Sequence, residues 1–473
     1  MSRLFVLRRA LFLTLILLTA LPAVSLAALP QPAAVARPAL APGPTATVTG
    51  DLVNIRSGPS TAYTILGRVT LGRSLEVIGK NKGATWLKVC CTTGDKQGWV
   101  SASLVKANSS LSAVPEVAAP APPPQTTAKR TTVSAPAPNV RAAGFFGYGI
   151  QVETSADKGF IIGAVKNMGF NWIKFQLPWK DFEGQPGQVD FGGLDDMIGQ
   201  FNGNGLSILA SIVKAPQWAR AGNSNFDVEG PPADPGTYAN FVRGFASRYC
   251  GRVQAIEVWN EQNLWYEWGG EPLDPGRYVQ LLAAAYRAIK GACPGMIVVS
   301  GALTPTGAPA PLAMDDVAYL SAMYRAGLRS YSDAIGAHPS GFNCPPDGDW
   351  RSVSDAGAIY RGPFDNRHHS WCFRGTMEGY RNVMLANGDG AKRIWPTEFG
   401  WAVSGNPHPG YEYAADNTAD EQAAWTVRAY ELARSWGWVG PMFLWNLNFE
   451  SGEQSAFKIY GRPTYDALRN MPK

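Results

Sequence analysis

The 473-residue chain has few of the side chains on which metal and nucleotide chemistry depend. It holds only four histidines, and two of them, His368 and His369, are adjacent without a second ligand pair at a usable spacing. The sequence contains no G-x-S-x-G nucleophile turn, no Walker loop and no H-E-x-x-H pattern. We therefore expect no metal site and no cofactor.

Charge is also scarce, with 17% charged residues and a formal net charge of +5. Three of the basic side chains, Arg3, Arg8 and Arg9, lie at the very start of the chain. The rest is close to balanced, whereas a nucleic-acid-binding domain normally carries a clear basic excess. We expect no nucleic-acid partner.

Long apolar runs are missing beyond the N-terminus. Residues 1–27 have the order of a secretory signal, with a basic start, the apolar run Leu11–Leu21 and a small-x-small sequence at Ser25–Ala27. We predict a signal peptide and a secreted protein, either extracellular or at the cell surface. An uncleaved anchor is the alternative, although the apolar run is short for a membrane span.

Short β-type runs separated by glycine and asparagine fill residues 45–106, after an Ala/Pro-rich spacer at 28–44. The apolar runs are Leu75–Ile78, Trp86–Val89 and Gly98–Val100. Several short strands at this spacing predict a small all-β barrel.

Two segments, Val53–Ser60 (VNIRSGPS) and Gly98–Ser101 (GWVS), make residues 45–106 resemble the bacterial SH3-like domain. The resemblance implies a module that tethers a secreted enzyme to the cell wall or to another surface. A structural appendage without a ligand is the alternative.

Residues 107–143 consist mainly of Pro, Ala, Ser and Thr, with almost no large apolar side chain. Such a composition cannot bury enough surface to fold. We predict a linker that lets the following domain sweep its surroundings.

Short apolar strands alternate with helical segments in residues 144–473. Eight strands are predicted, at 146–150, 172–176, 206–213, 253–259, 297–300, 334–337, 393–397 and 441–445. Helices are predicted to start at Asp234-Pro235, at Asp274-Pro275 and at the capping box Thr418–Glu421. This α/β pattern predicts a (β/α)8 TIM barrel. A doubly wound sheet is the alternative, but the Gly-rich phosphate turn that such sheets often carry is missing.

The six cysteines are disulfide candidates in an exported protein. Cys250 and Cys293 each follow a predicted helix and precede a predicted strand, so they could meet at the bottom of a barrel. Cys344 and Cys372 bracket one long loop. The state of Cys90–Cys91 is left open, because a bridge between neighbouring residues would be strained.

Two glutamates stand where a buried strand meets a loop. The fourth predicted strand closes with Val258–Gln262 (VWNEQ), and the seventh lies in Arg393–Gly400 (RIWPTEFG). A parallel barrel delivers the C-terminal ends of all its strands to one face, so we expect Glu261 and Glu398 to converge there. Two facing carboxyl groups are the working parts of a glycosidase.

These motifs make residues 144–473 resemble glycoside hydrolase clan A, in particular sequences of the family 39 and family 5 type. Further matching sequence segments are LPW at 177–179, GQVDF at 187–191, APQWA at 215–219 and His338-Pro339. The resemblance implies Glu261 as acid/base and Glu398 as nucleophile of a retaining enzyme that cleaves β-glycosidic bonds by double displacement. We expect Glu261 to be protonated at rest and Glu398 to be ionised.

The resemblance also implies substrate contacts. Asn260 matches the clan asparagine that binds the sugar 2-hydroxyl, and Trp445 matches the tryptophan beneath the sugar in subsite −1. His338 matches a position that often lines the cleft, but Ser340 stands where an aromatic is frequent, so one contact to the nucleophile is not matched. Tryptophans in predicted loops on the same face are further candidates for stacking on sugars: Trp179, Trp218, Trp265, Trp268 and Trp401.

We expect a secreted retaining glycosidase that acts on a polysaccharide or oligosaccharide. One alternative is a cell-surface carbohydrate-binding protein whose barrel has lost activity, against which the intact Glu261, Asn260 and Glu398 argue. The other alternative is an enzyme that cleaves peptidoglycan, which the SH3-like module suggests.

Overall fold

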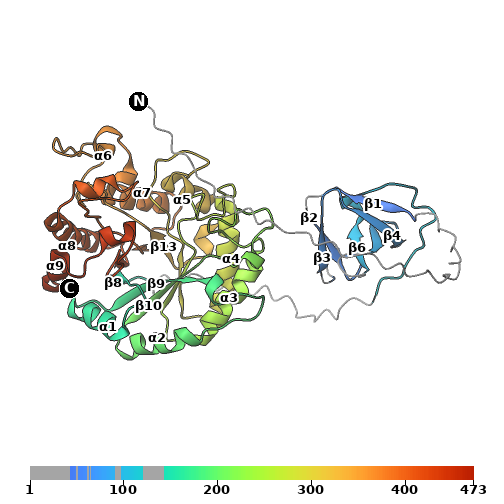
Figure 1. Cartoon of the computed structure of the whole chain (residues 1–473), viewed down its shortest axis with the longest axis horizontal. Coiled ribbons are helices and arrows are strands. Elements are labelled where there is room, and N and C mark those ends of the chain that lie inside the picture. Colours follow the sequence, from blue (N-terminus) through green and yellow to red (C-terminus); the bar gives the residue numbers. More distant parts are fainter. Residues whose placement is uncertain (1–42, 50–51, 61–62, 64, 91–96, 121–142) are drawn as a thin grey trace, which may run out of the picture. The chain divides into compact units, whose positions relative to one another are not determined.

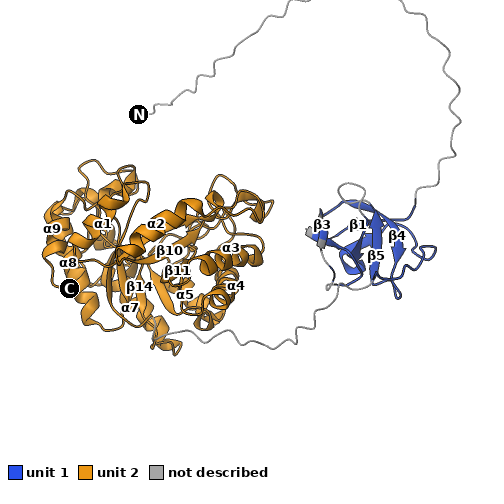
Figure 2. Ribbon diagram, turned by 90° about the horizontal axis from the view of Figure 1, so that it is seen from below, with its two compact units in different colours: residues 1–131 blue, residues 132–473 orange. Residues whose placement is uncertain are grey.

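The computed structural model describes residues 43–49, 52–60, 63, 65–90, 97–120 and 143–473. The predicted signal peptide and most of the spacer at 28–44 lie outside these residues, as does Cys91. The chain divides into two compact units, 1–131 and 132–473 (Figure 2). Within the described ranges, no helix combines the length and the apolar character that a membrane crossing requires.

The first unit is an antiparallel sheet whose strands follow the order β3-β2-β6-β5-β4-β1-β7. The strands are β1 (Thr45–Val48), β2 (Leu52–Arg56), β3 (Ile65–Thr70), β4 (Ser74–Lys80), β5 (Trp86–Cys90), β6 (Gly98–Ser101) and β7 (Val105–Ala107). Alternation along β4 and β5 directs Leu75, Val77, Leu87 and Val89 into one buried core. This confirms the prediction of a small all-β unit.

The first part of the predicted linker is not free chain, because residues 108–120 pack against this sheet. Lys80 N donates a hydrogen bond to Pro115 O (3.0 Å), and Val117 N donates one to Lys80 O (2.9 Å). Val114 is only 4% exposed and belongs to the core of the sheet. The few apolar side chains of this Pro-rich segment are therefore sufficient to dock it, and the remainder, 121–142, lies outside the described residues.

The second unit is built on parallel strands in the order β14-β13-β12-β11-β10-β9-β8-β15. They are β8 (Gly147–Gln151), β9 (Trp172–Pro178), β10 (Ser207–Val213), β11 (Ala255–Val258), β12 (Ile297–Ser300), β13 (Ala334–Ala337), β14 (Ile394–Pro396) and β15 (Pro441–Leu444). All eight predicted strands are present at the predicted places. Hydrogen bonds from Gly440 N to Ile394 O (2.8 Å) and from Trp445 N to Phe399 O (2.9 Å) join β14 to β15 and nearly close the ring.

Helices surround this ring on its outer side (Figure 1). They are α1 (Lys158–Asn167), α2 (Gly192–Gly203), α3 (Pro235–Arg248), α4 (Pro275–Ala292), α5 (Asp316–Arg325), α6 (Gly362–Asp365), α7 (Phe373–Ala386), α8 (Ala419–Ser435) and α9 (Pro463–Asn470). Asp234 and Asp274 cap α3 and α4 ahead of proline, and Thr418 with Glu421 forms a capping box on α8. The predicted α/β barrel and these helix starts are confirmed.

Side chains fill the inside of the ring in layers. On the N-terminal side of the ring, Trp172 packs edge to face on Trp395 and on Phe443 in an apolar plug. Above this plug, Lys174 and Glu257 form a wholly buried ion pair of 3.4 Å. The inside of the barrel is therefore a packed core. A solvent-accessible site is expected at the C-terminal ends of the strands.

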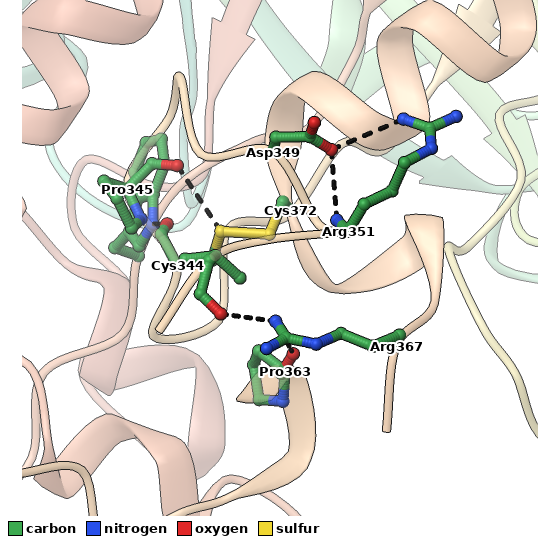
Figure 3. Close-up of a disulfide and its surroundings, with 9 residues drawn as sticks. Cys344, Pro345, Asp349, Arg351, Pro363, Arg367 and Cys372 are labelled. Atoms are coloured by element: carbon green, nitrogen blue, oxygen red, sulfur yellow. Dashed lines mark hydrogen bonds and ion pairs between the residues drawn. A yellow bond between two sulfur atoms is a disulfide. The ribbon is translucent and has the colours of Figure 1, made fainter. Parts of the chain in front are cut away.

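Two disulfides hold the barrel unit where the sequence predicts them. Cys250–Cys293 joins the end of α3 to the end of α4, below the strands. Cys344–Cys372 closes the long segment that follows β13, and Figure 3 shows Arg367 and the Asp349–Arg351 pair around it. The second bridge fixes the start of α7 against the loop that contains Cys344.

Candidate active site

Glu261 and Glu398 reach one face of the barrel from different strands. Glu261 follows β11, and its backbone N donates to Ala302 O (2.9 Å) across the top of β12. Glu398 follows β14 two residues beyond its end. The rule that parallel strands point their C-terminal ends to one face thus brings these distant residues together.

His338, after β13, stands between the two carboxylates. Its Nδ1 lies 2.9 Å from Glu261 Oε1 and 3.8 Å from Glu398 Oε2. One oxygen of each glutamate and a ring nitrogen of His338 all lie within 4.8 Å of one another. The predicted convergence of Glu261, His338 and Glu398 is therefore present in the structure.

Electrostatics in this trio differ from the expectation that Glu261 is protonated at rest. Burial raises the pKa of Glu261, but the hydrogen bond and the charge of His338 outweigh burial and hold that pKa below its ordinary value. Burial lowers the pKa of His338, while the charge of Glu398 and the hydrogen bond to Glu261 raise it more. Both shifts favour an ion pair of protonated His338 with ionised Glu261 in the substrate-free site.

Lys174 on β9 provides a second positive charge beneath the trio. Its Nζ donates to Glu398 Oε1 at 2.7 Å, and it lies 3.4 Å from Glu257 Oε2. Burial lowers the pKa of Lys174, but the charges of Glu257 and Glu398 outweigh burial and raise it. The lysine therefore stays charged and places its ammonium group beside both carboxylates.

The trio opens into a cleft of about 410 Å³. Asn260 lines it beside Glu261 and is 5% exposed, and its Oδ1 has no hydrogen-bond partner among the described residues. Trp445, at the end of β15, also lines the cleft and is half-buried. Both lie where a ligand in the cleft can reach them, as the sequence predicts.

Several of the predicted sugar-stacking tryptophans are instead part of the core. Trp179 is 0% exposed and packs on Phe241, and its indole N–H bonds to Glu183. Trp401 is 1% exposed and donates to Cys344 O (2.8 Å). Each indole N–H finds a protein acceptor and each ring finds an aromatic neighbour, so neither ring is free to stack on a sugar.

Three further tryptophans also lie away from the cleft wall. Trp218 is half-buried and lines a different depression, with its N–H bonded to Glu183 O (2.8 Å). Trp268 is wholly buried, and Trp265 is half-buried. The sequence placed these residues on the correct face but could not tell the inner side of a loop from its outer side.

The cleft wall contains residues that sequence reasoning missed: Gln176, Lys214, Tyr266, Glu267, Thr304, Phe342, Tyr411, Tyr413 and Glu453. Gln176 lies near the C-terminal end of β9, and Lys214 directly follows β10. The strand-end argument that found Glu261 could have found both of them. Tyr266, Glu267 and Tyr411 come from loops without a local pattern that singles them out.

Backbone strain is concentrated at this site. Within the described part of the barrel unit, the non-glycine residues with left-handed φ are Lys214 (58°), Trp259 (76°), Glu261 (47°) and Phe342 (52°). Three of them line the cleft, and Trp259 precedes Asn260. Each such residue costs about 1–3 kcal/mol and persists only where the surroundings enforce it, as at functional sites.

Comparisons with known proteins agree with this architecture. Residues 51–106 match the family model of the bacterial SH3 domain. A solved family 39 glycoside hydrolase from the gut symbiont Bacteroides cellulosilyticus WH2 superposes with a TM-score of 0.53 at 17% sequence identity, covering 91% of this chain and 77% of that one. At this identity the likeness shows that the two chains share a fold.

Further structural neighbours have lower TM-scores. A glucosidase from Croceicoccus marinus has a TM-score of 0.46 at 15% identity, covering 69% of this chain and 67% of its own. The cellulose synthase subunit Z of Clostridioides difficile has a TM-score of 0.46 at 12% identity, covering 68% and 99%. A comparison with curated protein sequences finds no match.

Proposed function

We propose that this protein is a secreted retaining glycosidase that hydrolyses β-glycosidic bonds of a polysaccharide or oligosaccharide. The observation that carries the proposal is that oxygens of Glu261 and Glu398 lie within 4.8 Å of each other in an aromatic-lined cleft. Retaining enzymes hold their carboxyl groups about 5–5.5 Å apart, whereas inverting enzymes need about 6.5–9.5 Å to admit water. The short separation favours double displacement.

In the first step, an oxygen of Glu398 forms a bond to the anomeric carbon. The bond from that carbon to the leaving oxygen breaks, its electron pair stays on the oxygen, and Glu261 donates a proton there. His338 Nδ1, 2.9 Å from Glu261 Oε1, supplies this proton to Glu261. The pair thus holds one proton next to the leaving oxygen, while Lys174 Nζ donates to Glu398 Oε1.

In the second step, water displaces Glu398 from the anomeric carbon and gives its proton to Glu261. The charge of Glu398 raises the pKa of His338 in the free site. The ester intermediate removes that charge, so the pKa of His338 falls. Glu261, no longer repelled by a neighbouring carboxylate, stays ionised and can accept the proton of water. Glu398 leaves as a carboxylate, and transfer of the proton from Glu261 back to His338 Nδ1 restores the starting charges.

The cleft wall suits a sugar chain. Trp445 offers a flat face, and Tyr266 and Tyr411 extend the aromatic wall beyond the trio. Asn260 Oδ1, which has no hydrogen-bond partner within the described part of the chain, can accept a hydrogen bond from a sugar hydroxyl beside Glu261. A substrate that supplies this hydrogen bond should bind more tightly than one that leaves the buried oxygen without a partner.

The N-terminal features support export and attachment. Residues 1–27 read as a secretory signal, and we propose that the protein acts outside the cytoplasm. The match of residues 51–106 to the bacterial SH3 domain supports a role for this unit in holding the enzyme on the cell wall or on another surface.

One experiment tests the reaction and its stereochemistry together. The full chain is incubated with a panel of β-linked polysaccharides, and the first products are followed by proton NMR before mutarotation. We expect reducing ends that appear first as the β-anomer, and no products from Glu398→Gln. Products that appear first as the α-anomer would overturn the retaining mechanism.

Peptidoglycan is the second candidate substrate, because the SH3 match points to the cell wall. Release of soluble muropeptides from purified wall, together with inactivity on other polysaccharides, would establish it. If no glycan is cleaved although one of them binds, the protein is a carbohydrate-binding protein and the proposed hydrolysis is wrong.

A further inference from the structure

A second cluster of imidazole and carboxylate groups lies outside the cleft. Asp315 Oδ2 is 3.3 Å from His368 Nε2 and 3.6 Å from His369 Nε2. One ligand atom from each of these three residues lies within 4.8 Å of the other two. None of the three lines the cleft, so the cluster serves no step of the proposed hydrolysis.

The three side chains are held in place by separate elements. Asp315 caps α5 through Oδ1, which accepts from Ala318 N (2.7 Å), so that its Oδ2 faces the histidines. His368 and His369 come three to four residues before Cys372, which is tied to Cys344 (Figure 3). The geometry of the cluster is therefore fixed by a helix start on one side and by a disulfide on the other.

Asp316 adds a buried negative charge beside the cluster. It is 0% exposed, and its Oδ1 lies 3.0 Å from His369 Nε2. Among the described residues, His369 is the one ion-pair partner of Asp316, and Asp316 Oδ2 has no hydrogen-bond partner. Thr306 N also donates to Asp316 Oδ1 (3.4 Å), and Asp316 lies in the first turn of α5. A buried carboxylate still favours a positive charge nearby.

We propose that Asp315, His368 and His369 bind one divalent transition-metal ion of the Zn²⁺ type. Ligand atoms at tetrahedral angles around Zn²⁺ stand about 3.3–3.6 Å apart, because zinc–ligand bonds are about 2.0–2.2 Å long. The separations from Asp315 Oδ2 to the two histidine nitrogens, 3.3 and 3.6 Å, fall in that range. Two imidazoles and one carboxylate leave the fourth position to water or to an external ligand.

The surroundings of His368 suit metal binding through Nε2. Its Nδ1 lies 2.7 Å from Ser370 Oγ and accepts from Ser370 N (3.4 Å), and these contacts orient the ring so that Nε2 lies 3.3 Å from Asp315 Oδ2.

The bound ion would cross-link two segments near the cleft. Asp315 ends the loop that follows β12, and Thr304 on the same loop lines the cleft near Glu261. The histidines belong to the segment closed by Cys344–Cys372. Metal binding would therefore join two loops on the catalytic side of the barrel. These loops are far apart in the sequence.

The test uses the full chain, stripped with a chelator and titrated with Zn²⁺ by calorimetry, with Co²⁺ absorption as a second readout. We expect one site per chain, a tetrahedral Co²⁺ spectrum and a higher Tm with Zn²⁺. Asp315→Asn, His368→Gln and His369→Gln should each weaken Zn²⁺ binding by about tenfold or more. His408→Gln, which changes an exposed histidine elsewhere, is the matched control and should bind as wild type does.

The catalytic trio could also take up Zn²⁺, since Glu261, His338 and Glu398 offer three ligand atoms within 4.8 Å. Glu398→Gln separates the two places and should leave the Zn²⁺ affinity, the Co²⁺ spectrum and the Tm shift unchanged. The proposal is overturned if wild type takes up no Zn²⁺. It is also overturned if Glu398→Gln abolishes uptake while folded His369→Gln retains it.

Discussion

Lys174 Nζ lies 2.7 Å from Glu398 Oε1, and the lysine side chain is wholly buried. The same ammonium lies 3.4 Å from the buried Glu257, so one cation serves two carboxylates at different depths of the barrel. Glu257 belongs to the packed interior, and Glu398 lines the cleft. Stability and activity are thus coupled through a single side chain, and mutations can separate them.

Lys174→Met should impair both properties. Removing the cation leaves Glu257 buried without its charge partner, which should lower the free energy of unfolding by about 3–5 kcal/mol. It also removes the donor from Glu398 Oε1, so kcat/KM on a cleaved glycan should fall by about 100-fold or more. Urea unfolding and initial-rate measurements check the two effects.

The double variant Lys174→Met/Glu257→Gln separates the two effects. Neutralising Glu257 removes the uncompensated buried charge, so much of the lost stability should return. Activity should stay low, because Glu398 still lacks its cation. Recovery of kcat/KM along with stability would show that Lys174 acts only as part of the core.

The two glutamates should differ in their dependence on the leaving group. Glu398→Gln should lose orders of magnitude in turnover on every substrate, because no other side chain replaces the nucleophile. Glu261→Gln should lose as much on a natural glycoside but retain rapid first-step release of a nitrophenolate, which departs without a proton. Burst kinetics with a nitrophenyl glycoside measure the difference. A Glu261→Gln variant that also lacks the burst would argue against its role as the acid.

His338 should set the alkaline limit of activity. Burial lowers its pKa, but Glu398 and Glu261 raise it above the ordinary 6.5, so the pair with Glu261 holds its proton to a higher pH than a free imidazole would. In His338→Gln the proton must reside on Glu261 alone, and the alkaline limb of kcat/KM should move to lower pH. A pH–rate profile over both limbs checks this. An unchanged limb would mean that the working proton resides on Glu261 in wild type as well.

Local sequence patterns predicted the barrel because its signals are themselves local. Each strand is a short apolar run, and the caps at Asp234, Asp274 and Thr418 mark the following helices. Glu261 and Glu398 could be paired from the sequence alone, since a parallel barrel requires that its strand ends converge. The same rule applied to Gln176 and Lys214 would have extended the site.

The remaining features depend on packing that no local pattern records. Trp179 and Trp445 both follow apolar strands, yet the first is wholly buried and the second lines the cleft. His368 and His369 lack a second ligand pair in the nearby sequence, and their carboxylate partners, Asp315 and Asp316, come from the start of α5. Such pairings follow from tertiary contacts between loops rather than from spacing along the chain.

Glu267 should make stability depend on pH. Burial and the charge of Glu261 raise its pKa to about 8, against about 4.5 ordinarily. Between these values the folded state holds a proton that the unfolded chain has released, so this residue makes stability fall as pH rises from about 4.5 to 8. Glu267→Gln should flatten that decline, whereas Glu431→Gln, an exposed glutamate on α8, should not. Urea unfolding at several pH values checks the slopes, and parallel curves for wild type and Glu267→Gln would contradict the assignment.

The two disulfides should affect different properties. Cys250–Cys293 lies below the strands, and closing a loop of 43 residues stabilises by up to about 4 kcal/mol. Cys250→Ser/Cys293→Ser should therefore lower the free energy of unfolding while kcat and KM at 25 °C stay at wild-type values. Cys344→Ser/Cys372→Ser should lower stability by a similar amount but also raise KM, because this bridge holds a segment on the catalytic side, where Trp401 donates to Cys344 O and packs on Phe373. The free energy of unfolding and KM are each measured for the variants, and for wild type at increasing concentrations of a reducing agent. Equal effects of the two double variants on KM would contradict a specific role of Cys344–Cys372 in holding the substrate-binding segment.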